Sequence, residues 1–213
     1  SLNGISASVI LTDSILCYGN LATIQVITTG SNIGWYLYSL SYQVLGNWYY
    51  LAQQTTYDTA IFPMLPPNTY QINVSDTSMN CSAQTTITIT QPNPLSLSIT
   101  PTLQTICQNQ PADSLILTPS GGLGTYQYEW RIYFPGTQSL QAVIIPNETD
   151  SFLIPSTATI GVAYYFSVVT SGPGCTDTSS IVTVETVSAP IFQSNSAGIQ
   201  PQDSVVCMGS NLT

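Results

Sequence analysis

The sequence contains no lysine, no histidine and a single arginine, Arg131, and charged residues make up only 5% of its 213 residues. Nucleic acids and anionic membrane surfaces are bound through several lysines and arginines, so neither is expected as a main partner. Without histidine there is no Ser-His-Asp or Cys-His relay and no histidine-ligated zinc. Without lysine there is no Schiff-base chemistry. We therefore expect a protein that is not an enzyme and that uses no metal and no cofactor.

The remaining composition is that of a folded protein, with 43% hydrophobic residues, 14 glycines, 14 prolines and a net charge of −9. This content is enough to form one large core or two ordinary ones. No run of 18 apolar residues is present, so no membrane insertion is expected in this segment. Because Ser1 does not open a signal peptide, we expect a segment from the interior of an exported protein.

The five cysteines follow an internal repeat of about 90 to 100 residues. The surroundings of Cys17, Asp-Ser-Ile-Leu-Cys-Tyr-Gly, return around Cys207 as Asp-Ser-Val-Val-Cys-Met-Gly, and Cys107 has a weaker version. Cys81 and Cys175 each follow a strand rich in tyrosine and valine. The spacing predicts three modules: 1–92, 93–188, and the beginning of a third at 189–213.

Matched cysteine separations predict one disulfide inside each module, Cys17 with Cys81 and Cys107 with Cys175, while Cys207 pairs beyond this segment. Buried thiols and a metal site are the alternatives, although metal sites usually bring cysteines in closely spaced pairs. A bond between Cys81 and Cys107 across the module boundary is a further alternative. Closing a loop of this size stabilises a domain by about 4 kcal/mol in the chain-entropy picture. Disulfides indicate an oxidising, extracellular location.

Alternating apolar and polar residues, rich in β-branched and aromatic types, predict short strands separated by Gly, Asn, Asp and Pro. In the first module they are expected at 6–12, 21–28, 34–39, 47–52, 69–76 and 84–90. In the second module they are expected at 95–100, 114–118, 125–134, 140–145, 151–154, 163–170 and 179–187. This pattern predicts an all-β chain of tandem immunoglobulin-like antiparallel β-sandwiches joined by short proline-containing linkers.

The predicted disulfides lie near turns, so we expect each bond at one end of its sandwich rather than across the middle. The three tryptophans are open to two interpretations. Core packing is the favoured one for Trp35, Trp48 and Trp130, and a ligand platform is the other.

Several motifs resemble the SprB-type repeats of Bacteroidota cell-surface gliding adhesins. They are an early cysteine with glycine two residues on, Gly-Thr-Tyr-Gln-Tyr-Glu-Trp at 124–130, Asn-Thr-Tyr-Gln-Ile-Asn-Val at 68–74, and a Thr/Ile strand ending Gln91-Pro92. The first module lacks the Gly-Gly and Tyr-x-Tyr-x-Trp stretch. The second module lacks the final Gln-Pro, and its ending is closer to that of generic Ig-like or PKD-like repeats. The resemblance implies a giant repetitive surface protein, exported by the type IX system, for adhesion or gliding motility.

All seven aspartates are followed directly by serine or threonine. Turn formation explains part of this bias, because Asp and Ser/Thr side chains bond nearby backbone amides. Bacteroidota, the group implied by the resemblance, O-glycosylate Asp-Ser/Thr followed by an apolar residue. Four sites match and are the candidates for O-glycosylation: Ser14, Thr59, Ser114 and Ser204.

Two functions remain from the sequence. The leading hypothesis is a stalk or filament segment of a surface adhesin, with neighbouring repeats, other surface proteins and covalent O-glycans as partners. The alternative is a polysaccharide-binding module, in which four tyrosines form an exposed platform: Tyr36, Tyr38, Tyr49 and Tyr50.

Overall fold

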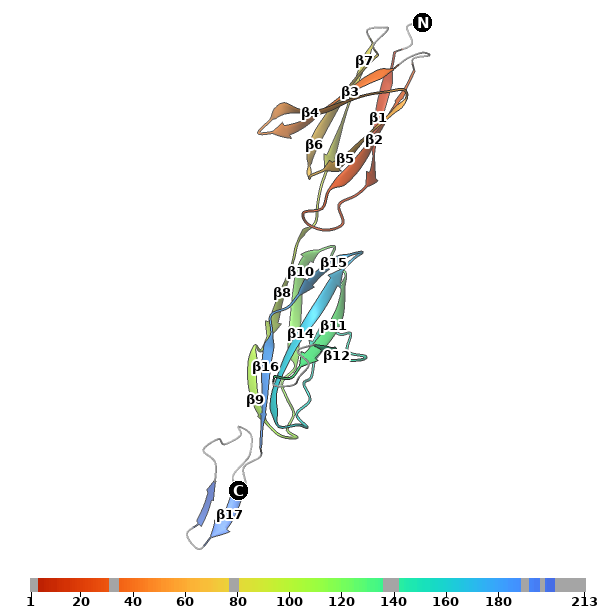
Figure 1. Cartoon of the computed structure of the whole chain (residues 1–213). Helices are drawn as coiled ribbons and strands as arrows, with labels where there is room; N and C mark the ends of the chain where they lie inside the picture. The colour runs from red at the N-terminus through yellow and green to blue at the C-terminus, as the bar shows by residue number, and fades with distance from the viewer. Residues whose placement is uncertain are drawn as a thin grey trace. The chain divides into compact units, whose positions relative to one another are not determined.

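The computed structural model describes residues 4–30, 35–76, 81–135, 142–188, 192–195 and 198–201. The chain divides into two units, Ser1–Pro94 and Leu95–Thr213. Every regular element in these described ranges is a β-strand, so the all-β prediction is confirmed (Figure 1). Within the same ranges there is no helix that is long and apolar enough to cross a membrane.

The first unit is a sandwich of two antiparallel sheets. One sheet has the order β1-β2-β5 and the other β4-β3-β6-β7. This arrangement, with three strands on one sheet and four on the other, is that of an immunoglobulin-like domain. The strands are β1 (Ser6–Asp13), β2 (Ala22–Thr29), β3 (Tyr36–Val44), β4 (Asn47–Thr56), β5 (Thr59–Leu65), β6 (Asn68–Asp76) and β7 (Ser82–Ile89).

The alternation of the sequence places one side of each inner strand in the core of the first unit. On β2, Ala22, Ile24 and Val26 are buried, and the residues between them are half-buried. The facing sheet contributes large residues from β3 and β6, including Tyr38, Leu40 and Ile72. Strands with a period of two can bury one face only, so two such sheets must pack on each other.

A tyrosine hydrogen bond fixes the entry to β6. The side chain of Tyr70 is 1% exposed, and its hydroxyl donates a 2.8 Å hydrogen bond to the carbonyl oxygen of Pro66. Such a bond from a tyrosine near the start of this strand to the backbone upstream is the tyrosine corner of immunoglobulin-like sandwiches. Burial raises the pKa of the Tyr70 hydroxyl to about 12.

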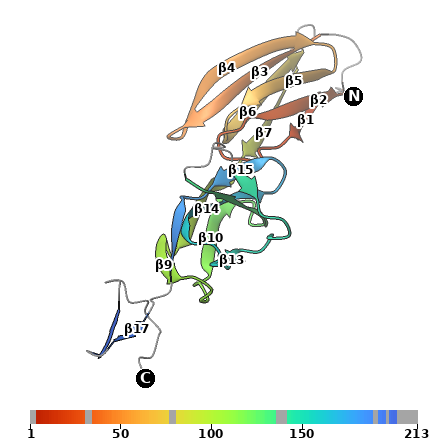
Figure 2. The same cartoon turned by 60° about the horizontal axis from the view of Figure 1, so that its bottom comes forward.

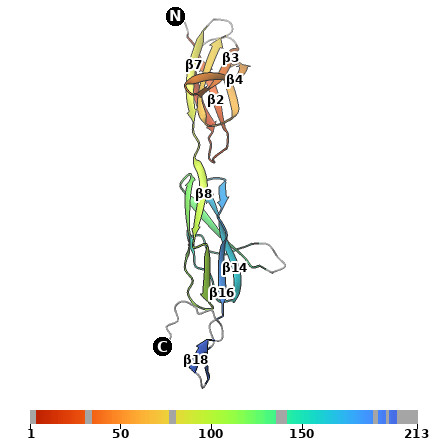
Figure 3. The ribbon, with the colours of Figure 1, turned by 90° about the vertical axis from the view of Figure 1, so that its left-hand side faces the viewer.

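The second unit repeats the sandwich with more irregular strands. Its two sheets have the orders β13-β10-β8 and β12-β11-β14-β16-β9, and β15 pairs with β14 beside the second path. The strands are β8 (Asn93–Thr100), β9 (Leu103–Cys107), β10 (Leu115–Gly122), β11 (Tyr126–Tyr133), β12 (Val143–Ile144), β13 (Phe152–Leu153), β14 (Gly161–Ser171), β15 (Cys175–Thr178) and β16 (Val182–Val187). Figure 3 shows β14 and β16 side by side, as their antiparallel register requires.

Trp130 lies at the centre of the second core. Its side chain is fully buried, and its indole Nε1–H donates a 2.9 Å hydrogen bond to the carbonyl oxygen of Asp150. Leu115, Val169 and Val182 belong to the same cluster. Each unit therefore has a separate core, as expected for modules that fold by themselves.

Within the two sandwiches, three described strands were missed by the sequence pattern. β5 contains Pro63, and proline weakens a strand prediction because it cannot donate to the ladder. β9 and β15 are short, with five and four residues. β9 pairs in parallel with β16, from Leu103 opposite Thr183 to Cys107 opposite Val187. After the second sandwich, β17 (Phe192–Asn195) and β18 (Gly198–Pro201) form a two-stranded antiparallel sheet.

Candidate functional site

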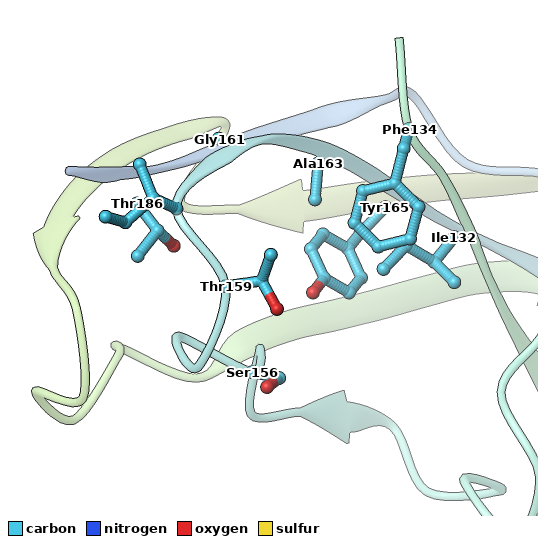
Figure 4. Close-up of a pocket in the computed structure, with 9 residues that line it drawn as sticks. Ile132, Phe134, Ser156, Thr159, Gly161, Ala163, Tyr165 and Thr186 are labelled. Atoms are coloured by element: carbon cyan, nitrogen blue, oxygen red, sulfur yellow. The ribbon is translucent and has the colours of Figure 1, made fainter. Parts of the chain in front are cut away.

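A small pocket opens at the surface of the second unit (Figure 4). Its volume is about 90 Å³, and its walls include Ile132, Phe134 and Ala163 together with the hydroxyl groups of Thr159 and Tyr165. Burial raises the pKa of the Tyr165 hydroxyl, and a hydrogen bond with the backbone of Ser156 partly offsets this shift. Ligand pockets for small molecules usually measure about 300 to 1,000 Å³, so this pocket is too small for one.

The described part of the chain contains no group of three or more His, Cys, Asp or Glu side chains able to hold a metal ion. Arg131 forms an ion pair with Glu129 on the same strand, where Nε donates a 2.7 Å hydrogen bond to a carboxylate oxygen. Both side chains are more than a third exposed, and pairs of this kind contribute at most about 1 kcal/mol. This pair needs no function beyond local strand stability.

Cys17, Cys107 and Cys175 are disulfide-bonded. The described cysteines lie in or beside turns, as the sequence predicted. In the first unit, however, Cys17 and Cys81 lie at opposite ends. Gly19, two residues after Cys17, donates its backbone N–H to the side-chain oxygen of Gln91, at 2.9 Å, just beyond the end of β7. Cys81 directly precedes β7, and its carbonyl accepts a hydrogen bond from the backbone of Asp76.

Eight residues of β7 therefore separate these two positions, a length of about 25 Å in an extended strand. The Cα atoms of a disulfide are at most about 7 Å apart. The predicted bond between Cys17 and Cys81 inside the first module is therefore wrong.

The same geometry excludes a bond between Cys107 and Cys175. Cys107 stands opposite Val187 at the end of β16, and the neighbouring Thr186 pairs with Gly161 at the beginning of β14. Cys175 pairs with Ser171 at the other end of β14. β14 has 11 residues, so the two cysteines are about 30 Å apart. The prediction of one disulfide inside each module fails in both units.

The strand directions explain this error. In the first unit β1 and β7 run in the same direction, and in the second unit β9, β15 and β16 do. Cys17 and Cys107 lie at or just after the ends of β1 and β9, whereas Cys81 and Cys175 lie at the beginnings of β7 and β15. The two cysteines of a unit therefore lie at opposite ends of its sandwich.

The O-glycosylation candidates lie at strand ends. Ser14 is exposed and follows β1, Thr59 is half-buried at the start of β5, and Ser114 is half-buried directly before β10. Ser204 lies outside the described residues. A bond from an aspartate side chain to the backbone is present at Asp177, near the end of β15, whose carboxylate accepts a 2.8 Å hydrogen bond from the backbone N–H of Thr178. Both interpretations of the Asp-Ser/Thr pattern therefore remain.

The aromatic side chains are distributed differently from the predictions. Trp130 is buried as expected, whereas Trp35 is 60% exposed and Trp48 is 38% exposed. The proposed tyrosine platform does not form, because Tyr36 and Tyr38 point into the core and only Tyr49 and Tyr50 are exposed. Tyr49 and Tyr50 are adjacent on β4 and therefore point to opposite sides of the sheet.

β4 is an edge strand whose hairpin with β3 extends past the core, and Figure 2 shows the two strands running together as a long ribbon. The first five residues of β4, Asn47 to Leu51, are all exposed. Sequence patterning could not identify this surface, because the alternation predicts which residues share a face and not how far the strand extends beyond its neighbours.

Trp48 and Tyr50 lie on the outer face of the four-stranded sheet. Tyr50 pairs with Ser41 on β3, which pairs with Gln71 on β6, which pairs with Thr86 on β7. The next row, two residues along, contains Gln53, Ser39, Asn73 and Gln84. Gln84 donates a 2.8 Å hydrogen bond to the side-chain oxygen of Asn73. These two rows, together with Trp48 and the Gln43 opposite it, are here called the outer polar face.

Comparison with known proteins finds solved structures with a similar fold, but it does not assign the chain to a family. No protein-family model and no curated protein matches the sequence. The fold is similar to the three N-terminal domains of the bacteriophage RB49 highly immunogenic outer capsid protein, with a TM-score of 0.43 and 12% identity over 86% of this chain and 59% of that one. It is also similar to the four N-terminal Ig domains of Dscam1 isoform 6.9, with a TM-score of 0.37 and 12% identity over 88% of this chain and 47% of that one.

A third similar structure contains the fibronectin(III)-like modules of Clostridium thermocellum CbhA, with a TM-score of 0.35 and 10% identity over 85% of this chain and 94% of that one. The chain thus spans less than two thirds of the first two proteins. These neighbours are Ig-like and fibronectin-like sandwiches, the fold already described by the strand order of each unit.

Proposed function

We propose that this chain is a stalk or filament segment of a repetitive bacterial surface adhesin. The observation that carries the proposal is the repetition itself: two sandwiches, each with its own core, follow one another in a sequence whose cysteine motif begins again at Cys207. β7 ends at Ile89 and β8 begins at Asn93, so the connection between the sandwiches is very short. Short connections containing proline limit the rotation of successive modules.

The proposal includes an extracellular location and no enzymatic activity. Disulfide bonds at three described cysteines are consistent with an oxidising compartment. Export by the type IX system and a part in gliding motility follow only from the resemblance to SprB-type repeats. O-glycans at Ser14, Thr59, Ser114 and Ser204 belong to the same proposal, and a native mass equal to that of the bare polypeptide contradicts them.

Electron microscopy of the full-length protein tests the stalk proposal. We expect extended fibres with a periodic spacing of one module. Small-angle scattering of this 213-residue segment is the matched measurement in solution, and it should give a maximum dimension well above that of a compact domain of equal mass. Compact particles in both experiments contradict the proposal.

A polysaccharide-binding function is the second candidate. The tyrosine platform expected from the sequence is absent, but the exposed Trp48 and Tyr50 beside a row of amides and hydroxyls favour a different site on the same sheet.

A further inference from the structure

We propose that the outer polar face of the first unit binds a neutral, hydroxyl-rich polysaccharide, with Trp48 and Tyr50 as stacking residues. This inference does not depend on the stalk proposal; it rests on the second candidate function and names its site and its class of ligand. It rests on the register of β4, β3, β6 and β7 and on the exposure of the two aromatic rings.

The two rings lie on the same side of the sheet. Trp48 and Tyr50 are two residues apart on β4, so their Cα atoms are roughly 7 Å apart and their side chains point in the same direction. Tyr50 is 64% exposed and Trp48 is 38% exposed. Aromatic rings provide a flat apolar surface and, in these two residue types, a polar atom at the edge. The face of a sugar ring that carries its C–H groups is also flat and apolar, so it can stack on these aromatic rings.

The neighbouring side chains provide hydrogen bonds of both kinds. Gln43 stands opposite Trp48, and Ser41 and Gln71 continue the row of Tyr50. Amides and hydroxyls each donate and accept, which is what a ligand made of hydroxyl groups requires. On the strands of this sheet the amides and hydroxyls follow one another over two consecutive rows, so a long chain molecule has partners along its length.

The charge of this surface selects among possible ligands. No Asp, Glu or Arg is present in the two rows or beside the two rings, whereas the whole chain carries a net charge of −9. A negatively charged protein repels acidic polysaccharides, and this surface has no cation to offset that repulsion. A neutral polysaccharide has no charged group that must give up its hydration on binding. This class of ligand therefore fits the outer polar face.

Affinity electrophoresis of this 213-residue segment tests the proposal, with dextran, a soluble β-1,3-glucan or galactomannan in the gel and alginate as the acidic comparison. We expect retardation by at least one neutral polysaccharide and none by alginate. Trp48→Ala and Tyr50→Ala should each weaken binding about tenfold, a loss of about 1.4 kcal/mol.

Tyr57→Ala is the matched control. Tyr57 is 56% exposed, but it lies in the turn between β4 and β5, away from the outer polar face. This variant should bind as the unchanged protein does. Circular dichroism confirms that each variant is folded. The proposal is overturned if no neutral polysaccharide retards the protein, if the control loses as much binding as the two test variants, or if the test variants change only self-association.

Discussion

The buried hydroxyl of Tyr70 makes the stability of the first unit sensitive to alkaline pH. Burial raises its pKa to about 12 in the folded state, whereas a tyrosine in an unfolded chain titrates near 10. Above pH 10 the unfolded chain loses this proton while the folded protein keeps it, so the free energy of unfolding decreases as pH rises. Below pH 10 both states are protonated, and the contribution is fully present.

We therefore expect the free energy of unfolding to fall by about 2 to 3 kcal/mol between pH 10 and pH 12. Urea unfolding at a series of pH values measures this. Tyr70→Phe should cost about 1 kcal/mol at neutral pH, because the hydrogen bond to Pro66 is lost, and should have a smaller slope above pH 10. Parallel pH curves for the two proteins contradict the assignment to Tyr70.

Residue exposure was the least predictable property at this scale. The alternation around Trp130 correctly indicated a core residue, because β11 has a neighbouring strand on each side in its sheet. Trp48 occupies a similar alternating pattern, but its strand is at the edge of a sheet and its hairpin extends past the core. The sequence contains the periodicity and not the position of the strand in the sheet, which depends on contacts between distant residues.

At the scale of elements, the end of β10 depends on a close approach between Gly122 and β14. Gly122 has a φ of +60°, and a Cβ there would be 2.7 Å from the Cβ of Ser171 and in collision with the Ser171 hydroxyl. Ser171 is fully buried, and its hydroxyl accepts a 2.8 Å hydrogen bond from the backbone N–H of Leu123. The serine therefore has no free space to move into.

Gly124 is the natural comparison, with a φ of +81° and open space around it. Gly124→Ala should cost about 1 kcal/mol, from the backbone conformation alone. Gly122→Ala should cost about 1 to 3 kcal/mol more, because of the overpacking against Ser171. The midpoints of urea unfolding give both values. Equal costs would show that β10 and β14 separate easily at this point.

Most strands were predictable because one face of each is buried. The expected strands at 6–12, 21–28 and 69–76 agree with β1, β2 and β6 to within a residue at each end. The pairing partners of the strands were harder to predict, because the parallel pairing of β9 with β16 joins residues that are 80 apart in the sequence. In the first module an odd number of strands places Cys17 and Cys81 at opposite ends, but the missed β5 left an even number of expected strands.

At the scale of the whole molecule, the cysteine positions predict that no disulfide closes within a sandwich. Cys17 and Cys81 lie at opposite ends of the first sandwich, and Cys107 and Cys175 lie at opposite ends of the second. Because Cys17, Cys107 and Cys175 are disulfide-bonded, we expect each of them to be joined to a cysteine outside its own sandwich.

Peptide mapping without reduction tests this prediction. The peptides around Cys17, Cys107 and Cys175 should each be linked to a peptide from outside their own sandwich, and these links should disappear after reduction. Cys17→Ser should remove the link at Cys17 while leaving both cores folded, since neither sandwich is closed by it. A peptide joining Cys17 to Cys81, or Cys107 to Cys175, contradicts the distances given by β7 and β14.

The parallel pairing of β9 with β16 determines how the second unit responds to mechanical tension. Its five residue pairs are continued by hydrogen bonds from Thr183 N to Thr102 O and from Gln108 N to Val187 O. When the two ends of this unit are pulled apart, the strands slide along each other, because both run from entry to exit. The hydrogen bonds are then loaded together in shear, whereas a hairpin pulled at its open end would break them one at a time. Unfolding under force depends on the barrier to this concerted rupture, so we expect the second sandwich to resist tension applied at its two ends.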